Sequence, residues 1–200
     1  MKKTIIECGA NRGTDTDHLL KKWDDSVVYA IEPTHELLYN YLYPKFKNNN
    51  RVKVFPFAVD IENGFKQFNI AGQSDWGCSS LNSFTDEIEN IWMDRPDFKM
   101  THSYYVPTIT LKSFCVLYNI DVIDYLWIDT QGHDYKVLTS LGDKIEHVVA
   151  GKCEVAMNIE LYKNTQNTLK IVKPWLINRG FKVEIAPDAT SAECDLHFSR

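Results

Sequence analysis

The sequence predicts an α/β fold built on a doubly wound, mostly parallel sheet. Short apolar runs rich in β-branched residues alternate with longer stretches in which apolar residues have helical spacing. This alternation is typical of strand-helix-strand units. The first apolar run also ends in a turn that contains Gly9 and Gly13 and leads into a helical stretch. We expect residues 1–200 to form a single domain, because one domain usually takes about 100–200 residues.

The first part of the chain alternates strictly between predicted strands and helices. Leu19, Leu20 and Trp23 form the apolar face of the first helix. Pro33 opens the second helix, since proline is well suited to a first helical turn. The predicted strands are residues 4–8, 26–31 and 51–57, and the predicted helices are residues 14–23 and 33–46. Together they make one half of a doubly wound sheet.

The middle of the chain is less regular. Residues 65–71 predict an additional strand, whereas residues 72–103 have no sustained period. We interpret residues 72–103 as a lid or acceptor region, because long irregular loops in compact domains are usually functional. Beyond it, strands are expected at residues 106–111, 124–129, within 146–156, 182–186 and 195–199, and helices near 112–118, 133–141 and 167–179. The last two strands are close enough to form an antiparallel hairpin at the sheet edge.

Composition and charge exclude several classes of protein. A hydrophobic fraction of 44% with 24% charged residues is that of a globular protein. The net charge of −5 disfavours nucleic acid as a partner, because phosphate binding needs a basic surface. Five cysteines without a CxxC pair favour reduced thiols and a cytoplasmic location. No apolar run has the length of a signal peptide core or a membrane span, so we expect no membrane partner.

The glycine turn predicts a binding site for a nucleoside-bearing ligand. Gly9 and Gly13 allow a ligand to approach the backbone, and the start of the next helix supplies unpaired N–H groups. The spacing is G-x-x-x-G, which departs from the G-x-G-x-x-G of dinucleotide sites and lacks the G-K-[ST] of phosphate-binding loops. These departures disfavour an NAD(P)-dependent oxidoreductase, which remains an alternative hypothesis.

Carboxylates recur near the ends of the predicted strands. Glu32 lies 23 residues beyond Gly9, where a carboxylate can accept both hydroxyls of a ribose. Its alternative role is that of a helix N-terminal carboxylate. Because ligands of open α/β sheets bind at the carboxyl ends of the strands, we expect one crevice lined by Glu7, Glu32, Asp60, Asp129 and Glu154. Such a crevice suits a cationic, hydroxyl-rich ligand, and S-adenosylmethionine is both.

Six blocks of the sequence resemble a known family. They are residues 5–13 (IIECGANRG), 30–33 (AIEP), 57–60 (FAVD), 79–81 (SSL), 106–111 (VPTITL) and 124–134 (DYLWIDTQGHD). In this order they are similar to the FkbM-type class I methyltransferases. The resemblance implies a seven-stranded Rossmann-like fold, S-adenosylmethionine as methyl donor, and O-methylation of a sugar, glycan or other small acceptor.

The resemblance also implies site residues. It places Glu7, Gly9, Asn11 and Gly13 around the methionine part of the cofactor, Glu32 at the ribose, Ala58 and Asp60 at the adenine edge, and residues 129–134 on the methyl-transfer side. Trp127 and Asp134 depart from the family, which often has lysine and glutamate at these positions. These departures concern the acceptor chemistry more than cofactor binding.

Asp129 and His133 are the candidates for removing the acceptor proton. Histidine has an unperturbed pKa near neutrality, whereas a carboxylate needs its pKa raised. Their alternative roles are structural, as an N-cap for Asp129 and as a helix-start residue for His133. Asp129, His133, Asp134 and Glu154 have no spacing that identifies a metal site, so we predict none. A non-catalytic nucleoside-binding or interaction module is the remaining alternative.

Overall fold

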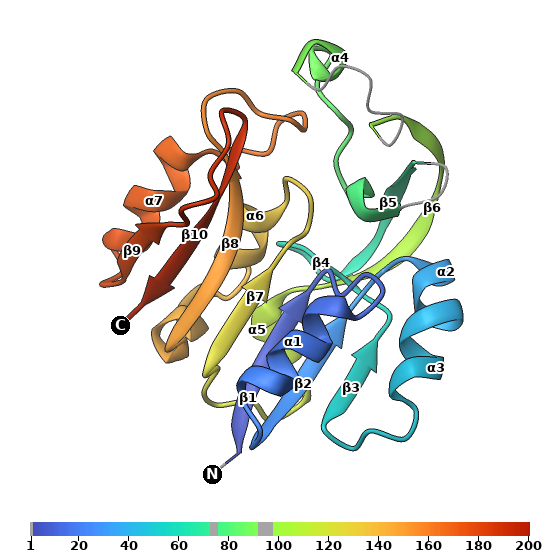
Figure 1. The fold of residues 1–200 in the computed structure, drawn as a ribbon, viewed down its shortest axis with the longest axis vertical. Helices are drawn as coiled ribbons and strands as arrows, with labels where there is room; N and C mark the ends of the chain where they lie inside the picture. Colours follow the sequence, from blue (N-terminus) through green and yellow to red (C-terminus); the bar gives the residue numbers. More distant parts are fainter. Residues whose placement is uncertain (1, 73–75, 92–97) are drawn as a thin grey trace.

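The main sheet has seven strands and confirms the predicted fold class. The computed structural model describes residues 2–72, 76–91 and 98–200. In sheet order the strands are β3 (Val52–Phe55), β2 (Ser26–Ile31), β1 (Lys3–Cys8), β7 (Tyr125–Ile128), β8 (Ala150–Ala156), β10 (Glu193–Ser199) and β9 (Lys182–Ile185) (Figure 1). The first five pair in parallel, and β10 is antiparallel to both of its neighbours. The predicted edge hairpin is therefore present.

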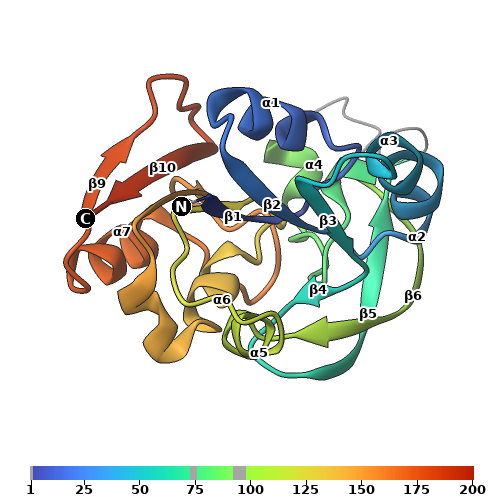
Figure 2. The same cartoon turned by 90° about the horizontal axis from the view of Figure 1, so that it is seen from below.

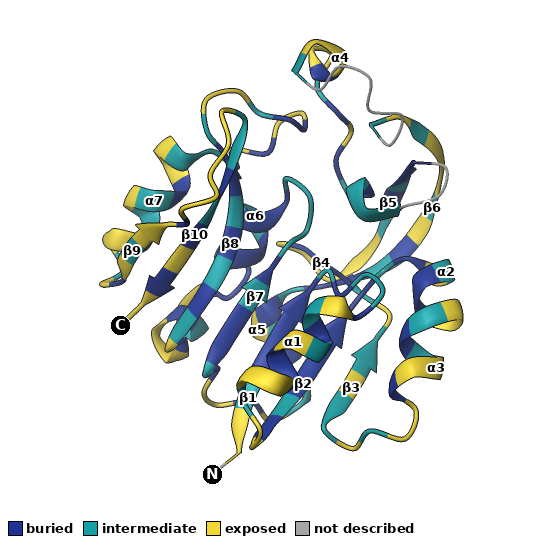
Figure 3. Ribbon diagram, in the orientation of Figure 1, coloured by how far each residue is buried: buried dark blue, intermediate teal, exposed yellow. Residues whose placement is uncertain are grey.

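Helices cover both faces of this sheet. α1 (Thr14–Lys22) lies on one face, and α5 (Leu111–Leu117), α6 (Asp134–Thr139) and α7 (Leu169–Ile177) lie on the other (Figure 2). α2 (His35–Leu37) continues through a π-helical turn, Leu38–Leu42, into α3 (Tyr43–Phe46), and packs in the same core as α1. Figure 3 shows that β7 and the carboxyl-terminal part of β1, which lie between these layers, are mostly buried. The sheet therefore holds the carboxyl ends of β1, β2 and β7 in fixed positions.

An aromatic cluster fills the core beneath β2 and β3. Phe114 of α5 is fully buried, and its ring meets Phe55 edge-on with centroids 5.0 Å apart. Tyr29 and Tyr118 pack against the same ring. Aromatic pairs in such edge-to-face contacts add to the stabilisation from apolar burial. This cluster fixes α5 against the strands that lead to the candidate site.

A second, three-stranded sheet is a departure from the predicted organisation. Its order is β4 (Ala58–Val59), β6 (Met100–Ile109) and β5 (Gly64–Ala71). The expected strand at residues 65–71 is confirmed as β5. β6 begins well before residue 106, inside the region predicted to be irregular, because its polar first half pairs antiparallel with β5. Tertiary pairing here outweighs the weak strand signal of the local sequence.

The predicted excursion contains further short elements. A 3₁₀ turn spans Trp76–Cys78, and α4 spans Ile88–Ile91. The part of the lid hypothesis that concerns residues 73–75 and 92–97 lies outside the described residues. Other boundaries shift slightly: the second helical stretch begins at His35 rather than residue 33, and Leu111 begins α5 rather than ending a strand. Thr110 causes that change, because its side chain caps α5 by accepting a hydrogen bond from the Ser113 amide at 3.0 Å.

Two further observations concern the described part of the chain. Within it, no helix has the length and apolar character needed to cross a bilayer. All five cysteines are free thiols, and Cys8 is fully buried as a small core residue.

Phe114→Ala should destabilise the fold by about 3–5 kcal/mol, the usual cost of removing a buried phenylalanine ring. Val116→Ala is the matched control on the same helix, since Val116 is 64% exposed. Urea unfolding of the two variants beside the parent protein measures both costs. Equal losses in the two variants would contradict the assignment of Phe114 to the core.

Candidate functional site

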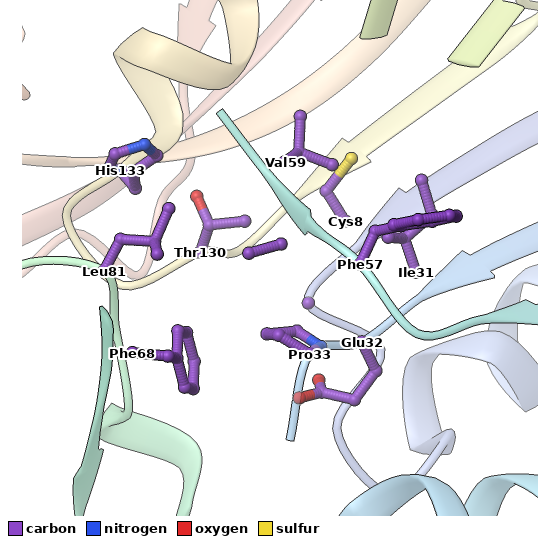
Figure 4. A pocket seen from close by; sticks show the side chains of 12 residues that line it. Cys8, Ile31, Glu32, Pro33, Phe57, Val59, Phe68, Leu81, Thr130 and His133 are labelled. Carbon is purple, nitrogen blue, oxygen red and sulfur yellow. The ribbon is translucent and has the colours of Figure 1, made fainter. Parts of the chain in front are cut away.

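A cavity opens at the carboxyl ends of β1, β2 and β4. Figure 4 shows Glu32 and Pro33 on one side, and Leu81, Thr130 and His133 on the other. Its complete lining is Cys8, Gly9, Ile31, Glu32, Pro33, Phe57, Ala58, Val59, Phe68, Leu81, Thr130 and His133. Four residues predicted from the sequence, Gly9, Glu32, Ala58 and His133, therefore meet here.

Gly9 brings the ends of β1 and β7 into close contact. Its φ is +88°, and a Cβ at this position would lie 1.9 Å from the backbone oxygen of Asp129. A side chain is therefore excluded both by the left-handed backbone and by this contact. The amides of Gly9 and Ala10 both donate to the Ile31 carbonyl, at 2.9 and 3.1 Å. The loop is thus fixed to β2 as well as to β7.

Glu32 fastens the glycine loop to the start of α2. One carboxylate oxygen accepts the Asn11 amide at 2.8 Å, and the other accepts the Thr34 amide at 2.8 Å. Burial raises the pKa of Glu32. Thr34 is the N-cap of α2. Glu32 therefore also has its alternative role, that of a carboxylate at the start of a helix. Asn11 takes a positive φ of 48° to reach this contact.

Glu7 and Asn11 present buried acceptor atoms beside the loop. The Thr16 hydroxyl donates to Oε2 of Glu7 at 2.6 Å. Among the residues that the structure describes, Oε1 of Glu7 and Oδ1 of Asn11 have no hydrogen-bond partner. Burial raises the pKa of Glu7 to about 8. Buried acceptors without partners are costly, so these atoms are suited to a ligand that supplies donors.

Gly13, the last glycine-loop residue of the prediction, is the N-cap of α1. Its carbonyl accepts a hydrogen bond from the Lys45 ammonium at 2.7 Å, and that ammonium also pairs with Asp17 at 2.7 Å. Gly13 therefore positions α1 against α3.

Asp129 follows β7 and is half-buried. Its amide donates to the Cys8 carbonyl at 3.0 Å, and its Oδ1 accepts the side-chain amide of Gln131 at 2.6 Å. Burial raises the pKa of Asp129. Its alternative role as an N-cap is wrong, because the N-cap of α6 is His133.

His133 is buried and bonded through both ring nitrogens. Nδ1 lies 2.9 Å from the Asn82 side-chain nitrogen, and Nε2 lies 2.9 Å from Oδ1 of Asp60. Because the Asn82 NH₂ group is a donor, Nδ1 accepts and Nε2 carries the proton that is donated to Asp60. Burial lowers the pKa of His133. These contacts hold the His133 ring in place at the start of α6, and its catalytic role stays a prediction.

Asp60 bonds to His133, and its predicted place at the adenine edge stays a prediction. Its Oδ2 forms a 2.5 Å ion pair with Lys66. Burial alone would raise the pKa of Asp60, but the hydrogen bonds from His133 and Lys66 bring it below its ordinary value. Ala58, the other residue predicted for the adenine edge, does line the cavity.

The expectation of one crevice lined by all five carboxylates does not hold. Glu32 lines the first cavity, whereas Glu154 lines a second cavity with Gly132, Val155, Ala156, Leu161, Tyr162, Thr165, Asn167 and Glu193. Asp134 bonds to one residue of each lining. It accepts hydrogen bonds from the amide and hydroxyl of Thr130, at 2.8 and 2.6 Å, and from the Glu154 amide at 2.8 Å. Burial raises the pKa of Asp134 to about 7.

Sequence reasoning missed several residues at the site. Asn82, which contacts His133, was not predicted, and Gln131 was included in the segment 129–134 without its contact to Asp129. Lys152, the cross-strand partner of Trp127, places its ammonium 4.3 Å from the centroid of that indole. It also pairs with Asp195 at 2.5 Å. A cation is thus present beside Trp127, supplied by the neighbouring strand.

The described residues contain no group of three or more His, Cys, Asp or Glu side chains arranged to hold a metal ion. The absence of a metal from the reaction stays a prediction.

Comparison with known proteins identifies a family and a fold. The family model "Methyltransferase FkbM domain" matches residues 7–183. The structure is similar to precorrin-6y C5,15-methyltransferase from Geobacter metallireducens, with a TM-score of 0.52, 10% identity, and coverage of 100% of this chain and 80% of that one. It is also similar to the METTL16 methyltransferase domain, with a TM-score of 0.50, 12% identity, and coverage of 100% and 60%. No curated protein sequence matches the chain. At these identities the structural likeness shows the fold.

Glu7→Gln should flatten the fall of stability with rising pH. Between its ordinary pKa of 4.5 and about 8, folded Glu7 keeps a proton that the unfolded chain releases. The unfolding free energy therefore decreases as pH rises through this window. The Glu7→Gln variant loses the pH-dependent contribution of Glu7 to the unfolding free energy. It retains the similar contribution of Asp134, whose pKa is also raised.

Urea unfolding at several pH values between about 5 and 8 measures the difference. Glu184→Gln, at an exposed position of β9, is the control for the same chemical change. Parallel pH dependences in the Glu7→Gln variant and the parent would contradict the raised pKa of Glu7.

Proposed function

This chain belongs to the FkbM methyltransferase family, and on that premise we propose that it methylates a hydroxyl oxygen of a small or glycan-like acceptor with S-adenosylmethionine. The observation that carries the proposal is the pair of unpartnered buried acceptors beside the glycine loop, Oε1 of Glu7 and Oδ1 of Asn11. An ammonium group donates to both atoms once Glu7 has released its proton. The methionine part of the cofactor has such a group.

The lining of the cavity beside these atoms offers groups suited to the rest of the cofactor. The Glu32 carboxylate accepts two backbone amides and the Thr34 side chain, and its remaining acceptor capacity suits a ribose hydroxyl. Ile31, Phe57, Ala58 and Phe68 supply an apolar wall for a flat base. Gly9 leaves the backbone open to close approach. These contacts support the roles inferred for Glu7, Gly9, Asn11, Glu32 and Ala58.

Asp129 is the proton acceptor in this proposal. When bound, S-adenosylmethionine supplies a methyl group on a sulfonium, and the acceptor oxygen must lose its proton as it attacks. Both nitrogens of His133 are engaged, so its ring holds Asp60 and Asn82 in place. Asp129 lies at the carboxyl end of β7, and its raised pKa moves it closer to the range of a general base.

Glu32→Gln should weaken the binding of S-adenosylmethionine about tenfold or more, because an amide oxygen replaces only one of the two carboxylate acceptors and charged hydrogen bonds contribute about 1.5–3 kcal/mol. Isothermal titration with S-adenosylmethionine and S-adenosylhomocysteine measures this loss, with NAD as a negative control. Glu184→Gln should bind as the parent protein does. Binding of NAD in place of both sulfur ligands would overturn the proposed function.

Asp129→Asn should lower the rate of methyl transfer about a hundredfold to ten-thousandfold, the usual contribution of a general base. Binding of S-adenosylmethionine should stay within about threefold of the parent value, because the change leaves the first cavity intact. The measurement is transfer of a labelled methyl group to a panel of sugars and other hydroxylated compounds. Full activity in the Asp129→Asn variant would remove Asp129 from the proposed chemistry.

A further inference from the structure

Gln131 connects Asp129 to the wall of the second cavity. Its Nε2 donates to Oδ1 of Asp129 at 2.6 Å, and its Oε1 accepts the Tyr162 hydroxyl at 3.0 Å. An ionised carboxylate can only accept hydrogen bonds, so the amide must present Nε2 to Asp129 and Oε1 to Tyr162. The three side chains form one hydrogen-bonded chain, at whose far end the Tyr162 hydroxyl also has the Cys78 carbonyl as an acceptor at 3.0 Å.

The backbone at Gln131 takes a conformation that side chains rarely adopt. Its φ is +56°, and the following Gly132 has a φ of +78°. A Cβ on Gly132 would lie 2.4 Å from a ring carbon of Tyr162, so the turn is pressed against that ring. The Gln131 carbonyl accepts the Ser80 hydroxyl at 2.8 Å. Left-handed backbone at a non-glycine residue persists where surrounding contacts hold it, and such residues gather at functional sites.

We propose that Gln131 is a positioning residue that orients the Asp129 carboxylate for proton transfer. This inference rests on the proposed function, in which Asp129 accepts the proton. Gln131 occupies Oδ1, and no side chain within the described ranges forms a hydrogen bond with Oδ2. Oδ2 is thereby directed to the acceptor hydroxyl. Because an amide is neutral, it steadies the carboxylate without opposing its ionisation.

The charged groups around Asp129 make a neutral residue at position 131 important. They are Asp15 on α1, Glu7 on β1, Glu32 after β2, Asp134 on α6, Lys152 and Glu154 on β8, and Asp195 on β10. Lys152 is the one cation in this set, and it already pairs with Asp195. Another carboxylate at position 131 would add a like charge in direct contact with Asp129.

Gln131→Glu and Gln131→Met test the proposal as a matched pair. Both keep an unbranched side chain and place the same strain on the left-handed backbone. The measurement is a pH titration of the Asp129 carboxyl carbon by ¹³C NMR in the full chain, with its resonance assigned by its loss in Asp129→Asn. We expect the apparent midpoint to rise in the order parent, methionine variant, glutamate variant, with the last at least about one pH unit above the parent.

The kinetic readout separates positioning from a structural role. We expect both variants to bind S-adenosylmethionine within about threefold of the parent and to turn over about tenfold to a hundredfold more slowly. Raising the pH should restore more of the rate of the glutamate variant, whose midpoint rises further, than of the methionine variant. Tyr162→Phe, which keeps the ring against Gly132, should cause a smaller loss than either.

Identical titration midpoints in the parent and both variants would overturn the proposal. So would losses of rate that are equal in the two variants and independent of pH. Gln131→Asn provides a check on folding, because asparagine tolerates a positive φ but is too short to span both partners. The NMR titration needs no substrate, so it tests Gln131 even if no methyl transfer is found. Failure of the parent to bind S-adenosylmethionine would instead count against the proposed function.

Discussion

The contact between Gly9 and the backbone of Asp129 is the constraint on which the rest of the site depends. Only glycine allows the end of β1 to approach the end of β7 this closely. The same loop is bonded to β2 through the Ile31 carbonyl and through Glu32. Three neighbouring strands therefore end close together in fixed positions. The positions of the candidate cofactor contacts depend on this junction.

Buried carboxylates hold the loops of the site together, and their surroundings set their pKa values. Glu32 and Asp134 each bond to backbone amides from two separate segments, so they act as cross-links between loops. Burial raises the pKa of both. Removal from water opposes ionisation, whereas the amide hydrogen bonds favour it. A cationic ligand would shift this balance towards the charged forms, which links binding at this site to proton release.

The sequence predicted those parts of the fold and site that depend on residues close together in the chain. β1 with its glycine loop, β2 with Glu32, and β7 with Asp129 each have a strand pattern followed directly by a polar or glycine residue. β6 was placed too late because its polar first half becomes a strand only through pairing with β5. The bonds of His133 to Asp60 and Asn82 join residues that are distant in the chain. No period or spacing in the sequence reports such contacts.

The segment 129–132 connects the linings of the two cavities. Thr130 lines the first cavity and Gly132 lines the second. Asp134 holds both walls together, because it bonds to Thr130 and to the Glu154 amide. In the proposed function, Asp129 at the start of this segment would meet the acceptor hydroxyl beside the glycine loop. Alignment would then follow from the rigid loop rather than from movement of a catalytic side chain.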